Sequence, residues 1–216
     1  MTELTEGQHK AEFLVSETEG TISRETVTIL HGENLQAGHV LGKVSVGAAT
    51  GAAAAGNVGN GTITNVSAGS GVKAGTYVID CIEPAANGGT FAVEEPGGSI
   101  IGTAQVGTPF VGAINFTLTD GATDFAAGDR FTVVVGGGSG KYKEYRSSNT
   151  DGSQTAVAVL LDAVDATAAD KDGVIIARQA EVNAAELVWF TGATDAQKTA
   201  GANQLKNQTI LVRAAV

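Results

Sequence analysis

Short runs in which apolar and polar side chains alternate recur along most of the chain. Alternation with a period of two residues is typical of β-strands that bury one face. Between the runs lie turn sequences rich in Gly, Asn and Asp. The alternation predicts strands at 25–30, 43–46, 61–66, 75–82, 90–93, 99–104, 113–118, 129–135, 155–161, 173–178, 186–190 and 208–213. We therefore expect a mainly β protein.

One segment near the C-terminus has the pattern of a helix instead. Thr194 and Asp195 can cap an Ala-rich helix that runs to about Lys206. Gly201 weakens this helix, because glycine is a poor helix former. The predicted fold is therefore mainly β with one short C-terminal helix.

The first twenty residues differ from the rest of the chain. Residues 1–20 are polar and rich in Glu and Thr, with a single apolar patch at Phe13, Leu14 and Val15. Segments of this kind often become ordered only when a partner offers a strand edge. We expect residues 1–20 to form a flexible N-terminal arm.

Two tracts of small residues, 47–56 and 136–140, divide the remainder of the chain. Such Gly- and Ala-rich tracts suit flexible linkers at the two ends of an inserted domain. The six strands predicted between them describe a small antiparallel β-sandwich. We expect residues 47–140 to be this inserted domain, and 21–46 plus 141–216 to form one core that it splits.

Composition excludes several classes of protein. The chain has 216 residues, a net charge of −10 and 13 basic residues without a basic run, which argues against binding nucleic acid through its phosphates. The single cysteine, Cys81, excludes an internal disulfide, and its alternating neighbours predict a buried thiol. No secretory signal and no apolar stretch long enough to span a membrane is visible. We expect a soluble protein made in a cytoplasm.

The sequence offers no enzymatic motif. Gly137–Lys141 resembles a phosphate-binding loop, but Val135 and Tyr142 stand where that motif needs Gly and Ser or Thr, so we interpret the tract as a linker. Glu94 and Glu95 are neighbours on a predicted strand and point to opposite faces, so they cannot act as one acid–base pair. Ser70 lacks the frame of a nucleophile elbow. We expect no catalytic residue and no enzyme.

Metal and cofactor sites are not predicted either. The three histidines, His9, His31 and His39, have no partners at metal-ligand spacing, and we expect them at the surface or in turns. The aspartates at 165, 170 and 172 lack the spacing and the closing Glu of a calcium loop, so a solvated turn is expected there. We expect no metal and no cofactor.

The parts of the chain outside 47–140 resemble the phage lambda-type head decoration proteins, also called capsid cement proteins. The resemblance depends on the order of several segments more than on any one motif. These segments are Phe13–Glu17, Ser23–Glu25, Ala37–Lys43, Tyr142–Tyr145, Asp151–Leu161, Arg178–Asn183, Leu187–Phe190 and Thr209–Arg213.

This resemblance implies a β-clip-like fold, a homotrimer, and a place in the virion on the outer surface of the expanded capsid. It also implies that the arm adds a strand to an edge of the major capsid protein. We expect Phe13, Leu14 and Val15 to be the apolar anchors of this contact and Arg24 to pair with a capsid carboxylate. The alternative, in which Phe13–Val15 fold back onto their own core, stays open. Trp189 and Phe190 are expected in the core or at the trimer interface.

Two other functions are compatible with the sequence. The sandwich at 47–140 is also suited to a host-attachment protein that binds a bacterial surface or glycan. A hydrolase would need a catalytic site that no motif reveals. The leading hypothesis is a structural protein that stabilises the expanded capsid by clamping neighbouring major capsid proteins.

Overall fold

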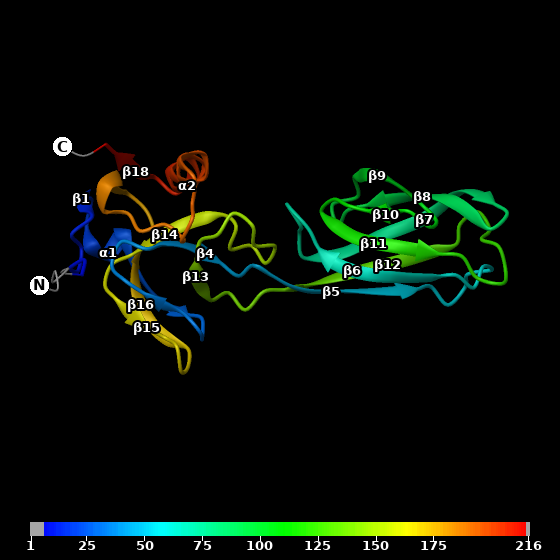
Figure 1. Ribbon diagram of the computed structural model, residues 1–216, viewed down its shortest axis with the longest axis horizontal. Coiled ribbons are helices and arrows are strands. Elements are labelled where there is room, and N and C mark those ends of the chain that lie inside the picture. The colour runs from blue at the N-terminus through cyan, green and yellow to red at the C-terminus, as the bar shows by residue number, and fades with distance from the viewer. Residues whose placement is uncertain (1–6, 215–216) are drawn as a thin grey trace, which may run out of the picture. The chain divides into compact units, whose positions relative to one another are not determined.

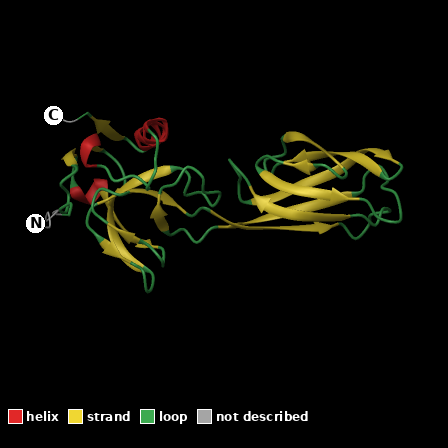
Figure 2. Ribbon diagram, in the orientation of Figure 1, coloured by secondary structure: helices red, strands yellow, loops and turns green. Residues whose placement is uncertain are grey.

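The computed structural model describes residues 7–214 and contains two compact units (Figure 1). The split unit combines the chain up to Val44 with the chain from Gly140 onward, and the central unit comprises Ser45–Ser139. Strands dominate both units (Figure 2), which confirms the prediction of a mainly β fold. That the central unit is a domain inserted into a decoration core stays a prediction.

A closed five-stranded barrel forms the body of the split unit. Its strands follow the order β13 (Tyr142–Glu144), β2 (Arg24–Ile29), β16 (Lys171–Ile176), β14 (Ala156–Leu160) and β4 (Val40–Lys43). Only the β13–β2 pair is parallel. Buried apolar side chains form a core cluster of this barrel, among them Ile29, Leu41, Leu160 and Ile175. Two short strands, β3 (Asn34–Leu35) and β15 (Val164–Asp165), pair beside the barrel.

The terminal sheet, the second sheet of this unit, joins segments from both ends of the chain. In it, β17 (Ala180–Asn183) lies between β1 (Leu14–Glu17), which is antiparallel to it, and β18 (Ile210–Arg213), which is parallel. The predicted strand at 186–190 is wrong. Ala184–Glu186 instead forms the 3₁₀ helix η1, in which the Asn183 side chain accepts the Ala185 N–H.

The C-terminal helix α2 (Asp195–Asn207) confirms the helix prediction. Its first turn is a capping box, because the Gln197 N–H donates to the Thr194 hydroxyl and the Thr194 N–H donates to the Gln197 side chain. A second, short helix, α1 (Gly20–Ser23), precedes β2. The glycine inside α2 has a packing reason: a Cβ at Gly201 would lie 2.4 Å from Cζ3 of Trp189.

Gly201→Ala is therefore expected to destabilise the split unit by about 1–2 kcal/mol, although alanine is the better helix former by about 1 kcal/mol. The added methyl group must displace the Trp189 ring, which itself packs edge-on against Tyr145. Denaturant unfolding followed by Trp189 fluorescence measures the effect. Asn203→Ala, on an exposed position of the same helix, is the control and should be neutral or slightly stabilising. A stabilising Gly201→Ala would contradict this account of the glycine.

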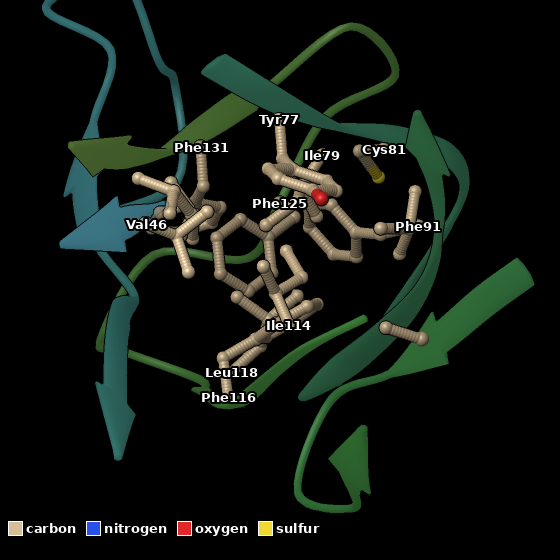
Figure 3. Packing of buried hydrophobic residues seen from close by; sticks show 14 residues of the cluster. Val46, Tyr77, Ile79, Cys81, Phe91, Ile114, Phe116, Leu118, Phe125 and Phe131 are labelled. Atoms are coloured by element: carbon tan, nitrogen blue, oxygen red, sulfur yellow. The ribbon is translucent and has the colours of Figure 1, made fainter. Parts of the chain in front are cut away.

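The central unit contains two antiparallel sheets. The five-stranded sheet has the order β5 (Val46–Ala53), β12 (Arg130–Gly137), β7 (Gly75–Ala85), β8 (Gly88–Glu94) and β9 (Ile100–Gln105). The three-stranded sheet has the order β10 (Pro109–Phe110), β11 (Ile114–Thr119) and β6 (Thr62–Ala68). Large aromatic and aliphatic side chains from both sheets meet between them (Figure 3), and they include Tyr77, Phe91, Phe116, Leu118 and Phe131. Cys81 lies in this core, as predicted.

The interpretation of the two small-residue tracts as flexible linkers is wrong. Residues 47–53 lie in β5, which pairs with β12 along its length, and Gly136 and Gly137 belong to β12. The small side chains have a packing role here, because a Cβ at Gly51 would lie 2.8 Å from Val66 and 3.0 Å from Ile63 of β6. Composition alone does not separate such a strand from a linker.

Candidate functional site

The N-terminal segment is the part of the split unit to which the sequence assigned binding. From Ala11 onward the chain is fixed by backbone hydrogen bonds: the Ala11 N–H donates to Leu161 O at 2.9 Å, and the Asn183 N–H donates to Phe13 O at 2.8 Å. β1 then pairs with β17. The described part of residues 1–20 is therefore structured in the free chain, where a flexible arm was expected.

The three apolar residues of this segment have different environments. Phe13 is only 1% exposed and belongs to the hydrophobic core of the split unit, together with Val182 and Leu205. Leu14 is half-buried against the same core, and Val15 is 51% exposed. The alternative left open by the sequence thus holds for Phe13, whose side chain cannot contact a partner in this conformation. Only Val15 offers a large apolar surface to solvent.

Arg24 already has a partner within the chain. Its Nε donates to Oε2 of Glu17 at 3.1 Å, and its Nη2 donates to the other carboxylate oxygen. The Ser23 hydroxyl donates to the same carboxylate. The hydrogen bonds from Arg24 hold the pKa of the Glu17 carboxyl below its usual value. Sequence reasoning missed Glu17, because no local pattern shows that the turn at α1 brings residues 17 and 24 together.

The terminal sheet carries a shallow groove of about 380 Å³. Glu181 is one of its lining residues, and its carboxylate accepts hydrogen bonds from the Ser16 hydroxyl and from Nε of Arg213, both at 3.0 Å. The groove is lined by Ser16, Glu17, Thr18, Gln179, Ala180, Glu181, Thr209 and Leu211. Among the described strands, β1 and β18 pair with β17 alone, so this sheet has two free edges.

A second, more apolar groove of about 200 Å³ lies between α2 and β18. Leu187, Trp189, Ala202 and Val212 contribute apolar surface to its lining. Trp189 is half-buried, whereas Phe190 is buried in the core beside Tyr145. Of the two aromatic residues that the sequence assigned to the core or an interface, Trp189 thus lines a surface groove and Phe190 is a core residue.

No group of His, Cys, Asp and Glu side chains in residues 7–214 is arranged to hold a metal ion. His9 and His31 are exposed, as expected. His39 is buried, but it closes a turn, as the second part of the expectation allows: its N–H donates to Gln36 O at 3.3 Å and its Nδ1 accepts the Gln36 N–H at 2.8 Å. Burial lowers the pKa of this imidazole. In the same described range, no helix has the length and apolar character needed to cross a bilayer.

Comparison with known proteins gives one strong match. A profile of the bacteriophage lambda head decoration protein D family matches residues 3–210. The search of curated proteins found no match. Two crystal structures of FlgL from Xanthomonas campestris share 19% and 18% identity with this chain, cover 50% of it, and have TM-scores of 0.33 and 0.32. The matched regions span about a third of each FlgL chain, 34% and 33%, and these weak likenesses carry no argument.

Proposed function

The chain belongs to the family of the bacteriophage lambda head decoration protein D, and we propose that it trimerises on the outer surface of the expanded capsid and clamps neighbouring major capsid proteins. The observation that carries this proposal is the family match over residues 3–210. The net charge of −10 supports the outer surface over the DNA-facing side, because an acidic protein does not neutralise phosphates.

Stabilisation follows from mass action. A subunit that binds the expanded lattice and no other state favours that lattice by about 1.4 kcal/mol for each tenfold excess over its dissociation constant. Three copies joined in one trimer bind together, so that contacts weak in isolation become strong through effective concentration. Each contact of a single subunit therefore needs little area.

The capsid contact in this proposal uses the free edge of β1. A strand of the major capsid protein adds to this edge by backbone hydrogen bonds, and Leu14 and Val15 contact it with their side chains. Phe13 does not contact the capsid in this proposal; its buried side chain fixes β1 on the core of the split unit. Arg24 fixes the end of β1 through Glu17, and it reaches a capsid carboxylate only where that ion pair opens.

The trimer contact in this proposal uses the groove between α2 and β18. Its half-buried residues Trp189 and Val212 offer apolar surface that a neighbouring subunit can cover. Tryptophan is among the residues that contribute most to interfaces once they are desolvated.

Binding to capsids tests the proposal. Purified full-length protein is mixed with expanded capsids that lack it, and bound copies are counted by sedimentation and located by cryo-EM. Val15→Asp is expected to weaken binding at least about tenfold, since the charge must be desolvated against the capsid. Val134→Asp makes the same change at a site of the central unit with similar exposure, 45% against 51%, and should bind as the unchanged protein does. If the unchanged protein does not bind expanded capsids, the proposed function is refuted. If Val15→Asp binds as tightly as the unchanged protein, the proposed role of β1 is refuted.

A further inference from the structure

One side of the central unit ends in two strands with free outer edges. β9 is the last strand of the five-stranded sheet and pairs with β8 alone among the described strands, and β10 is the last strand of the three-stranded sheet. The two contact each other across a groove of about 240 Å³. This groove is lined by Thr103, Ala104, Gln105, Thr108, Pro109, Phe110 and Val111. Residues 99–111 are called the β9–β10 edge below.

This edge lacks the protection that edge strands normally carry. No Asp, Glu, Lys, Arg or His lies between Glu95 and Asp120. Natural proteins usually place charges, especially Lys, on exposed edges to prevent pairing with another chain. Pro109 blunts β10, because proline has no N–H to donate, so β9 is the strand that is free to pair.

The β9–β10 edge is also apolar. Val111 is 80% exposed and Ile100 is 67% exposed, more than any other large apolar side chain of residues 7–214. The opposite side of the central unit provides a comparison within the same unit. There, β5 and β6 are equally free of charge, but their exposed residues are Ala, Gly, Thr, Asn and Ser. The two most exposed large apolar side chains of the central unit, Val111 and Ile100, therefore lie on this edge, although Val58, Ile82 and Val134 are exposed elsewhere in the unit.

We propose that the β9–β10 edge is a contact between copies of this chain, in which β9 pairs antiparallel with β9 of a second copy and buries Ile100 and Val111. Antiparallel pairing of one strand with itself has two-fold symmetry, so a single surface serves both partners. The distribution of charge favours a second copy of this chain as the partner. Each chain carries −10, and the central unit has seven acidic residues against Lys73 and Arg130, so two copies approach with least repulsion where both are uncharged.

The expected contact is weak in dilute solution. Two paired strands of six residues with their flanks bury less than about 1,000 Å², the lower limit for a stable interface. Where many copies are held close together, effective concentration makes such a contact significant. Its role between neighbouring copies on a capsid rests on the proposed function, but the pairing itself does not.

Sedimentation of the full-length protein without capsids tests the pairing. Its average mass is expected to rise between about 10 µM and about 1 mM, the range for a small interface. Ile100→Lys should weaken this association at least about tenfold, because it replaces an apolar contact at each end of the paired strands by a charge that must be desolvated. Ala52→Lys places the same charge on the exposed opposite edge, at β5, and should leave the association unchanged.

Each result decides the proposal. A mass that stays constant up to about 1 mM, or an association that Ile100→Lys leaves intact, would overturn it. Binding of bacterial polysaccharide that Ile100→Lys abolishes, in protein that does not self-associate, would also overturn it and assign the edge to a glycan. The unchanged protein can also form a trimer through contacts of its split unit. If Ile100→Lys keeps this trimer but loses the assemblies larger than a trimer, the pairing through β9 is supported. If the protein self-associates through β9 but does not bind capsids, the proposed function is refuted and the β9 contact is supported.

Discussion

Phe13→Ala is expected to destabilise the split unit by about 3–5 kcal/mol, the cost of truncating a fully buried phenylalanine. The Phe13 side chain is enclosed by the core that contains Val182 and Leu205, and its carbonyl accepts the Asn183 N–H. Removing the ring leaves a cavity and weakens the attachment of β1 to β17. A loss of this size is a large part of the stability of a typical domain.

Trp189 fluorescence measures this loss directly, because the only tryptophan of the chain lies in the split unit. The control is Val15→Ala, two residues away and half exposed, which should change the unfolding free energy by less than about 0.5 kcal/mol. Unchanged stability of Phe13→Ala, with capsid binding lost, would restore the interpretation of Phe13 as a flexible anchor. The experiment thus separates the two meanings of the apolar patch that the sequence left open.

Much of the central unit could be predicted from the chain alone. The strands at 75–82 and 129–135 lie inside β7 and β12 apart from one residue, because large apolar residues alternate there between glycine-rich turns. β5 escaped prediction, since Gly and Ala show no alternation of size or polarity. Its strand character comes from pairing with β12 and from packing against β6. Both of these are tertiary effects.

The split unit shows what local patterns omit. Leu187–Phe190 has the composition of a strand, yet its residues make a single bridge, from Val188 to His39. Composition could not show that both edges of β17 in the terminal sheet are paired with other strands, β1 and β18. Similarly, the apolar patch at 13–15 predicts a strand that pairs with a partner protein, whereas β1 pairs with β17 of the same chain, more than 160 residues distant in the sequence. The direction in which Phe13 points follows from that pairing.

The largest effect expected in the central unit comes from Asp129→Ala, at about 3 kcal/mol or more. Asp129 is 4% exposed and lies where β12 begins. Its carboxylate accepts the backbone N–H groups of Val58 at 2.7 Å, Gly59 at 2.8 Å and Ala126 at 3.0 Å. Alanine leaves these three donors without the carboxylate: the hydrogen bond from Gly59 is buried and those from Val58 and Ala126 are partly buried, and a buried unsatisfied donor costs about 1–3 kcal/mol.

The same contacts predict a dependence on pH. Burial alone would raise the pKa of the Asp129 carboxyl, but the hydrogen bonds from Ala126, Val58 and Gly59 outweigh it and hold this pKa below its ordinary value. The unfolded chain therefore binds the proton more readily than the folded chain. The stabilisation by Asp129 is complete above its unfolded pKa of about 3.9 and is lost as the pH falls through the lower folded value. Asp129→Ala should remove this part of the acid sensitivity.

The reactivity of Cys81 measures the opening of the central unit, just as Trp189 fluorescence measures the unfolding of the split unit. It is the only cysteine, it is buried in the core of the central unit, and its thiol reacts with a labelling reagent only when that core opens. Labelling across a denaturant series should show earlier opening in Asp129→Ala, while the unfolding of the split unit, followed at Trp189, stays unchanged. Asp124→Ala is the matched control, because it removes the same charge from an exposed carboxylate that accepts a single backbone N–H, that of Asn87. If both variants opened the core equally, the loss would come from charge alone, and the three hydrogen bonds to Asp129 would not be what holds these loops together.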